Sequence, residues 1–289
     1  MRSKFAKKHF YFIIRIMKKF RRVLFLIPAG IMLILVVAQF LLYRRRPLEM
    51  TFDTAYYMTE KISSYGKWNY QKDYAGHETY LYIPDQYRYD KQREDPKLPL
   101  IVVFHGSCER SAGLSRYGRI FISNEFQRRM SPNGACVLVV LSRVEYFTDP
   151  ASVSLLIQNV VLKNKCIDPT KIVGYGFSQG AKFVVELACY EPRLFKAVIS
   201  GSGFYQMKVS ELIKLLPVQF YFATSKNDKG IYEQGSPTGK MCARWCKNSR
   251  YVEYETRYHF WVELFDRTGR KNKDGTDETA LDWIASVLK

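Results

Sequence analysis

The fold of this chain is decided by residues 171–189, with the sequence KIVGYGFSQGAKFVVELAC. The first five residues are β-branched, aromatic or small, a composition that favours a short strand. From residue 181 onward, apolar side chains recur at positions i, i+3, i+4 and i+7, which is the period of a helix. The pentapeptide GFSQG at 176–180 is therefore expected where a strand turns sharply into a helix.

Ser178 lies at the centre of this turn. In a strand–turn–helix of the form G-x-S-x-G, the strained turn holds the serine hydroxyl clear of the backbone. The two glycines remove the Cβ atoms that would collide with neighbouring elements. An ordinary turn serine is the alternative, but the flanking strand and helix favour a nucleophile elbow. Ser178 is therefore the predicted catalytic nucleophile.

Chain order narrows the choice of base and acid, because hydrolases with this elbow place the acid after the serine and the histidine last. Of the four histidines, only His259 follows Ser178, so His259 is the predicted base. Asp228 is the only aspartate between them and follows an apolar strand-like run at 218–224, so it is the predicted acid. Three glutamates remain alternatives for the acid: Glu233, Glu253 and Glu255.

An oxyanion hole also requires two backbone N–H groups aimed at the developing negative oxygen. One is expected from Gln179, the residue after the nucleophile. The other is expected from the loop after residues 98–104, whose nearly continuous apolar run is typical of a strand buried on both faces. Ser107 and Cys108 are the candidates in that loop. His105, in the same corner, is predicted to be structural and not a second base.

Strand-like and helical patterns alternate along the remainder of the chain. Strands are expected at 79–83, 98–104, 135–141, 171–175, 196–200, 218–224 and 251–256, and helices at 151–162, 179–190, 209–215 and 236–247. This alternation predicts one α/β domain with a mostly parallel sheet and helices on both faces. The interval 201–217 is short, so no large cap domain is expected. An open site of this kind suits a bulky or polymeric ester.

From about Glu78 to its end, the chain resembles the polyhydroxybutyrate-depolymerase and feruloyl-esterase-like branch of the α/β-hydrolase superfamily. The matching segments are YLYIP at 80–84, LPLIVVFHG at 98–106, IDPTKI at 167–172, EPRLFKAV at 191–198 and SGSG at 200–203. The resemblance implies an α/β-hydrolase fold and hydrolysis of carboxylic esters by Ser178, Asp228 and His259. The His-Gly pair that the family usually carries before its acid loop is replaced here by ATSK at 223–226.

Other functions remain open at this point. The tetrapeptide FSQG at 177–180 also resembles acyl-protein thioesterases and small carboxylesterases, so an acyltransferase or thioesterase using the same triad is an alternative. The unusual acid loop motivates a third interpretation, a catalytically inactive hydrolase fold that serves as a binding domain. No His/Cys spacing indicates a metal site and no glycine-rich phosphate loop occurs, so neither a metal nor a cofactor is expected.

The amino-terminal part of the chain predicts where the protein is located. Residues 23–43 are 21 residues without charge, enough to cross a hydrocarbon core as a helix. Nine Lys or Arg precede this run and three follow it, which predicts a cytoplasmic amino end. The expected organisation is a basic cytoplasmic arm (1–22), a transmembrane signal anchor (23–43), a juxtamembrane stalk with a first edge hairpin (44–75) and an extracytoplasmic hydrolase domain (76–289). Secretion after signal-peptide cleavage is the alternative.

The net charge of +18 is not a nucleic-acid signature. Residues 1–46 hold 12 Lys or Arg and no acid, whereas the remainder carries 33 basic residues against 27 acidic ones. Most of the imbalance thus belongs to the segment expected beside anionic lipid headgroups. The expected partners are an ester substrate and a membrane, and no nucleic acid.

The six cysteines all follow the predicted anchor: Cys108, Cys136, Cys166, Cys189, Cys242 and Cys246. An oxidising compartment would permit disulfides among them. Their spacing does not determine a pairing, which stays open.

Overall fold

The computed structural model describes residues 66–73, 76–88, 97–110, 113–130, 133–254, 258–260 and 278–289. All of them belong to one compact unit, Met50–Lys289. The predicted basic arm (1–22) and anchor (23–43) lie outside the described residues, as does the predicted stalk before residue 66. Within the described ranges, no helix is both long enough and apolar enough to span a bilayer.

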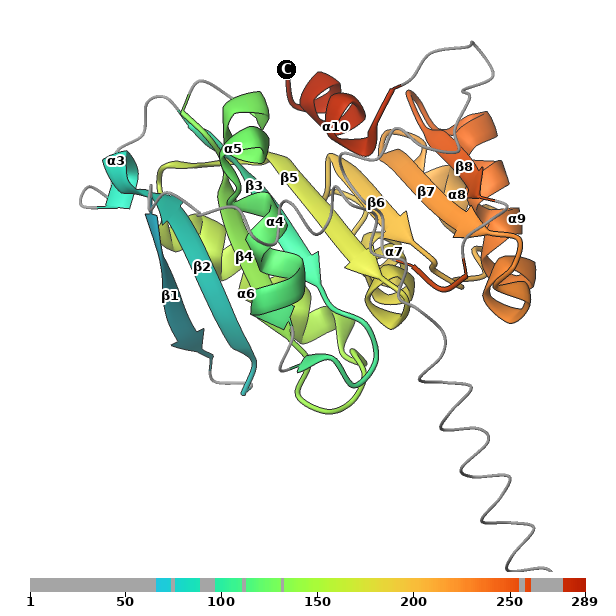
Figure 1. Ribbon diagram of the computed structural model, residues 1–289, viewed down its shortest axis with the longest axis horizontal. Coiled ribbons are helices and arrows are strands. Elements are labelled where there is room, and N and C mark those ends of the chain that lie inside the picture. Colours follow the sequence, from blue (N-terminus) through green and yellow to red (C-terminus); the bar gives the residue numbers. More distant parts are fainter. Residues whose placement is uncertain are drawn as a thin grey trace, which may run out of the picture. The chain divides into compact units, whose positions relative to one another are not determined.

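One sheet contains the strands of the described residues. These are β1 Gly66–Lys72, β2 Glu78–Pro84, β3 Leu98–Phe104, β4 Cys136–Leu141, β5 Ile167–Phe177, β6 Ala197–Gly201, β7 Gln219–Ser225 and β8 Arg250–Tyr254. Their order across the sheet is β1-β2-β4-β3-β5-β6-β7-β8 (Figure 1). β2 pairs antiparallel with β1 and β4, and every other pair is parallel. The prediction of a mostly parallel sheet is confirmed.

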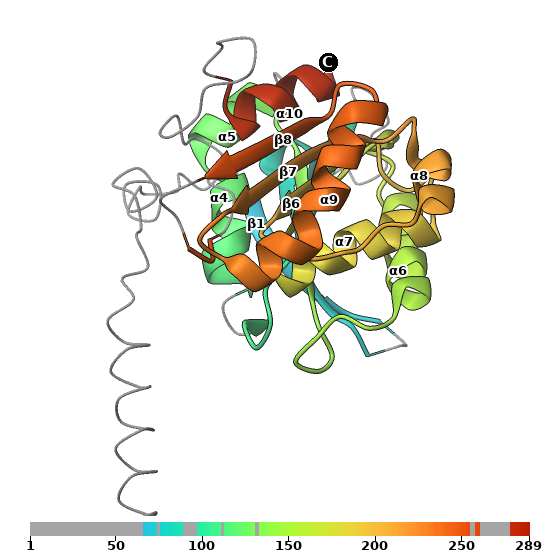
Figure 2. The ribbon, with the colours of Figure 1, turned by 90° about the vertical axis from the view of Figure 1, so that its right-hand side faces the viewer.

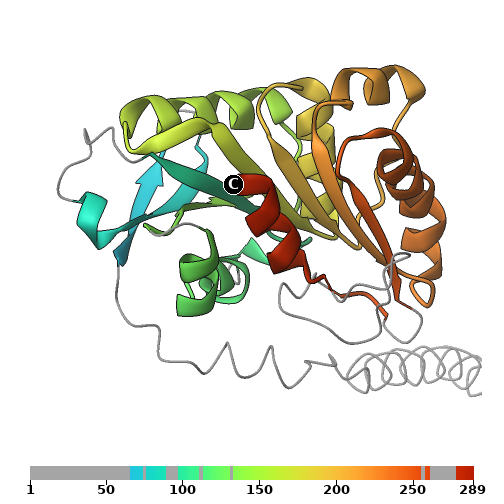
Figure 3. The same ribbon diagram turned by 90° about the horizontal axis from the view of Figure 1, so that it is seen from above.

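Helices cover both faces of this sheet. They are α3 Asp85–Arg88, a π-helix at Gly113–Gly118, α4 Arg119–Phe121, α5 Asn124–Met130, α6 Pro150–Lys163, α7 Gln179–Tyr190, α8 Val209–Leu215, α9 Lys229–Trp245 and α10 Ala280–Leu288. Figures 2 and 3 show α6, α7, α8 and α9 on one face and α4, α5 and α10 on the other. A sheet covered in this way is the architecture expected from alternating strands and helices.

The alternation of side chains along the central strands builds two cores. In β3, Leu100, Val102 and Phe104 belong to the cluster under α6 and α7. Ile101 and Val103 belong to the cluster on the opposite face. Every residue of β3 is buried, as expected for a strand covered on both sides. The two cores hold the carboxyl ends of the parallel strands in register, and the loops of the candidate site start there.

The main differences between the sequence prediction and the structure are the following. α9 begins at Lys229, seven residues before the expected start, because it contains Pro237 inside the helix and not at its first turn. β5 begins at Ile167, before the expected strand at 171–175, since the segment 167–170 is also extended. The helical segments between residues 113 and 130 were not predicted, because each is too short for a clear apolar period.

Candidate active site

Ser178 is the single residue between the end of β5 and the start of α7. Its backbone has φ 53° and ψ −117°, a strained conformation for a residue with a Cβ atom. Its two neighbouring glycines are required by packing: a Cβ on Gly176 would collide with the backbone of Gly180, and a Cβ on Gly180 with the carbonyl oxygen of His105. The predicted strand–turn–helix is confirmed.

His259 lies between the other two residues of the predicted triad. Its Nε2 is 2.8 Å from Ser178 Oγ, and its Nδ1 is 2.6 Å from Asp228 Oδ2. When Nδ1–H donates to the carboxylate, Nε2 is left as an acceptor for the serine hydroxyl. The side chain of His259 is 39% exposed and that of Asp228 is 18% exposed. The structure thus brings the predicted nucleophile, base and acid into one chain of hydrogen bonds that is open to water at the histidine.

Short backbone contacts position the acid and the base. Asp228 follows β7 and stands at the N-cap position of α9, and its N–H donates to the carbonyl oxygen of Ser225 at 3.2 Å. After β8, the base is held from the end of β6, because Ser202 Oγ donates to the carbonyl oxygen of Phe260 at 2.8 Å. The ring of Phe177 lies against the imidazole of His259, with 4.9 Å between centroids.

The three alternative acids differ in position. Glu233 is exposed on α9. Glu253 accepts hydrogen bonds from Tyr232 and Tyr251, and Glu255 lies outside the described residues. Among the described carboxylates, Asp228 is the one that contacts His259.

Of the two expected oxyanion donors in the loop after β3, the structure favours Ser107. The N–H of Cys108 donates to the carbonyl oxygen of Glu145 at 3.2 Å. The N–H of Ser107 makes no hydrogen bond with any described residue. Gln179 begins α7, where the first N–H groups of a helix have no partner within it. The N–H groups of Ser107 and Gln179 are therefore the available pair.

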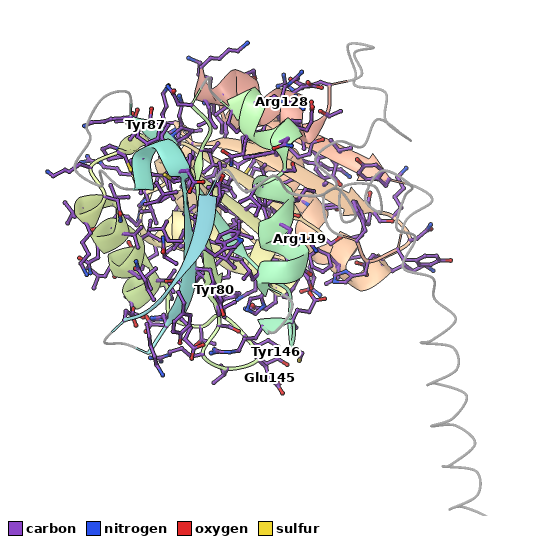
Figure 4. The ribbon with its side chains drawn as sticks, turned by 60° about the vertical axis from the view of Figure 1, so that its left-hand side comes forward. Tyr80, Tyr87, Arg119, Arg128, Glu145 and Tyr146 are labelled. Carbon is purple, nitrogen blue, oxygen red and sulfur yellow. The ribbon has the colours of Figure 1, made fainter. Side chains whose placement is uncertain are left out.

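A loop at 142–149, between β4 and α6, connects these two donors, and its sequence did not indicate this role. Its Glu145 accepts from Cys108, next to Ser107. Its Phe147 exchanges two hydrogen bonds with the side-chain amide of Gln179, at 3.0 and 2.9 Å. Figure 4 shows Glu145 and Tyr146 of this loop together beyond the end of the sheet. The loop thereby ties the β3 loop to the nucleophile elbow.

His105 has the structural role expected of it. Its Nδ1 is 2.7 Å from the carbonyl oxygen of Gly106, and its Nε2 accepts from the N–H of Ser142 at 3.1 Å. Burial lowers the pKa of His105, which favours the neutral ring that this pair of contacts requires. His105 therefore joins the β3 loop to the loop at 142–149.

A second Asp–His–Ser chain occurs at Asp73, His77 and Ser152. His77 Nδ1 is 3.0 Å from Asp73 Oδ2, and its Nε2 is 3.3 Å from Ser152 Oγ. Here, however, Ser152 Oγ donates to Asp149 Oδ2 at 2.7 Å, and Asp149 caps α6. The hydroxyl proton of Ser152 is thus donated to Asp149 and not to His77, and His77 is buried. This chain links the β1–β2 turn to α6, and it lacks a free nucleophile.

The cysteines are free thiols in the structure. Cys108 is exposed in the β3 loop, whereas Cys136 and Cys242 are buried in the core. Burial raises the pKa of the Cys189 thiol to about 12. Among the described side chains, no group of His, Cys, Asp and Glu is arranged to hold a metal ion.

No family model matches this chain, and no curated protein matches it. Solved structures do match. A thermostable esterase has a TM-score of 0.53 and 19% identity, over 79% of this chain and 61% of that one. An esterase from the archaeon Pyrobaculum calidifontis has a TM-score of 0.54 and 14% identity, over 82% of this chain and 86% of that one.

A CE1 ferulic acid esterase from the anaerobic fungus Anaeromyces mucronatus is also similar. Its TM-score is 0.56 at 11% identity, over 77% of this chain and 90% of that chain. The present chain thus spans most of the length of the archaeal and fungal enzymes but 61% of the thermostable esterase. At these identities the likeness concerns the fold, and this chain has the α/β-hydrolase fold found in esterases.

Proposed function

We propose that this protein is a serine esterase that hydrolyses carboxylic esters through an acyl-enzyme. The observation that carries the proposal is the continuous hydrogen-bond chain from Asp228 through His259 to Ser178. A strained elbow presents the serine, which is the arrangement of an activated nucleophile. The α/β-hydrolase fold shared with esterases supports the same reaction class.

In the first half of the reaction, Ser178 Oγ attacks the acyl carbonyl while His259 Nε2 takes its proton. The N–H groups of Gln179 and Ser107 receive the negative oxygen of the tetrahedral intermediate. His259 then returns the proton to the departing alcohol. In the second half, water attacks the acyl-enzyme with His259 as base, and Ser178 leaves protonated. Asp228 orients the imidazole and stabilises its positive form.

Two features favour hydrolysis by water over transfer to another acceptor. His259, which must activate the second nucleophile, is 39% exposed, so bulk water reaches it. Between β6 and β7 the chain forms only the short helix α8. The same openness supports a bulky or polymeric ester as substrate.

The test is to incubate the full-length protein in detergent with aryl, short-acyl and long-acyl esters. Alcohol and free acid should appear in equal amounts. Addition of a thiol or alcohol acceptor separates the alternatives: transfer of the acyl group to the acceptor in preference to water would identify an acyltransferase. Absence of alcohol release from every ester would contradict the proposal and favour a binding domain.

We also propose that residues 23–43 anchor the enzyme, with the amino terminus in the cytoplasm and the catalytic domain on the other side of the membrane. The support is the uncharged run of 21 residues and the excess of Lys and Arg before it. The exported domain would then meet its ester outside the cytoplasm.

A further inference from the structure

We propose that Glu253 is a positioning residue, which holds the turn that carries Asp228 against the strand that leads to His259. The inference rests on the proposed function, since it assigns Asp228 and His259 their catalytic roles. It goes beyond that function because Glu253 touches neither Ser178 nor His259 in the described contacts. It acts through the segments on which the acid and the base stand.

The carboxylate of Glu253, on β8, contacts side chains from its own strand, from α9 and from the end of β7. Its Oε1 accepts from Tyr232 at 2.9 Å and from Tyr251 at 2.7 Å. Lys240 lies 3.0 Å from the same oxygen, and Lys226 lies 3.6 Å from Oε2. A carboxylate with both oxygens engaged in this way links the end of β7, the first turn of α9 and the middle of α9.

Two of these donors flank the acid along the chain. Lys226 stands two residues before Asp228. Tyr232 stands one helical turn after it, and its N–H donates to the carbonyl oxygen of Asp228 at 2.8 Å. Glu253 thus contacts side chains on both sides of Asp228 along the chain, through the ion pair with Lys226 and the hydrogen bond from Tyr232. Because the hydrogen bond between Asp228 and His259 joins two surface segments, its length depends on how firmly those segments are held together.

Neighbouring contacts reinforce the connection on the β8 side. The hydroxyl of Tyr251 is 3.1 Å from Thr224 Oγ1, in the strand that ends just before Asp228. Gly239 of α9 packs directly on the ring of Tyr251, where a Cβ atom would come within 2.5 Å of it. Glu253 therefore lies where α9 packs against β8, and its carboxylate supplies the polar contacts between the two elements.

The contacts of Glu253 favour its ionised form. Burial opposes ionisation, but the hydrogen bonds from Tyr251, Lys240 and Tyr232 outweigh it and lower the pKa of Glu253 to about 2. These three hydrogen bonds also explain why this glutamate, an alternative for the acid on sequence grounds, is not available to the imidazole.

The main experiment compares Glu253→Gln with Glu233→Gln in the full-length protein. Both changes remove one negative charge, but Glu233 is exposed, and its side chain makes no hydrogen bond or ion pair with a described residue. We expect Glu253→Gln to lower kcat by about 10- to 100-fold, the cost of a misplaced catalytic group, with KM within about twofold of the wild-type value. Glu233→Gln should leave both constants unchanged.

A double-mutant cycle separates positioning from general support of the fold. Glu253→Gln is combined with Asp228→Asn, and residual activity is measured. If Glu253 acts through Asp228, adding Glu253→Gln to Asp228→Asn has no further effect on kcat, because the group that Glu253 positions is already lost. A further fall of the same size in the Asp228→Asn background would overturn the proposal. So would an unchanged kcat in Glu253→Gln.

Two additions keep the test decisive. If Glu253→Gln does not fold, Tyr232→Phe removes one hydrogen bond to the Glu253 carboxylate. Tyr190→Phe, on the exposed end of α7, is its control. If the wild type hydrolyses no ester, the proposed function fails on its own. The positioning is then read from the NMR signal of the Nδ1 proton of His259. That signal should broaden or shift in Glu253→Gln and not in Glu233→Gln, and an unchanged signal in both would refute the positioning role.

Discussion

Asp228 Oδ2 lies 2.6 Å from His259 Nδ1, although 31 positions separate the two residues in the chain. The contact is made because β7 and β8 run parallel and adjacent, so that the segments that follow them emerge at the same edge of the sheet. Ser178 reaches that edge at the end of β5. The site thus lies at the carboxyl ends of parallel strands, where ligands bind in open α/β sheets.

Replacement of the nucleophile should abolish activity without loss of the fold. Ser178→Ala removes the attacking oxygen, so ester hydrolysis and labelling by a fluorophosphonate probe should both be lost. The melting temperature should stay close to the wild-type value. Ser210→Ala, at an exposed position of α8, is the control and should be labelled normally. Labelling that survives in Ser178→Ala would place the nucleophile elsewhere.

Replacement of the acid should slow turnover and leave binding intact. In Asp228→Asn, His259 loses the acceptor that fixes its tautomer and the charge that stabilises its protonated form. We therefore expect kcat to fall by roughly 10³- to 10⁴-fold with little change in KM. Steady-state kinetics on an aryl ester measures this. A near-normal kcat would point to a different acid or to a site that works without one.

The elbow glycine should not tolerate a methyl group. In Gly180→Ala the new Cβ would meet the backbone oxygens of Phe104 and His105, which cannot move independently of β3. We expect a loss of about 1–3 kcal/mol in the free energy of unfolding, together with most of the activity. Gly230→Ala is the matched control, since its Cβ meets nothing within 4 Å in the first turns of α9. That change should stabilise the protein by up to about 1 kcal/mol. Equal unfolding curves for both variants would contradict the packing argument.

The contribution of Glu253 to stability should depend on pH. Its pKa is lowered in the folded state from 4.5 to about 2, so its stabilising effect is complete above pH 4.5 and is lost as the pH falls towards 2. The difference in unfolding free energy between wild type and Glu253→Gln should therefore shrink between pH 7 and pH 3, by at most about 2 kcal/mol, because solvent screens the exposed Lys226 and Lys240. Urea unfolding at both pH values tests this, and a constant difference would mean that the charge contributes nothing.

The topology of the protein can be tested on intact cells. With the amino terminus in the cytoplasm, protease added outside should remove an epitope tag placed after Lys289. A tag before Met1 should be protected until the membrane is permeabilised. Protection of the carboxyl-terminal tag would reverse the proposed orientation. Release of the tagged domain into the medium, with the anchor removed, would identify a cleaved signal peptide.

The sequence by itself determined the elements that depend on local pattern. Residues 98–104 and 179–190 were predicted as β3 and α7 with the bounds that the structure has, because an unbroken apolar run and a helical period are local signals. The GFSQG turn was predictable for the same reason, since its glycines and serine encode the strained corner within five residues. Chain order then sufficed to name His259 and Asp228 as candidates.

Only the tertiary structure decided which polar groups meet. Cys108 and Ser107 are equivalent candidates in sequence, and the carbonyl oxygen of Glu145, 37 positions further on, distinguishes them by taking one N–H. Glu253 was one of three alternative acids until its contacts with Tyr232 and Tyr251 showed what occupies its carboxylate. Hydrogen bonds between distant segments depend on how strands are ordered in the sheet and on side-chain packing. Neither leaves a periodic signal in the sequence.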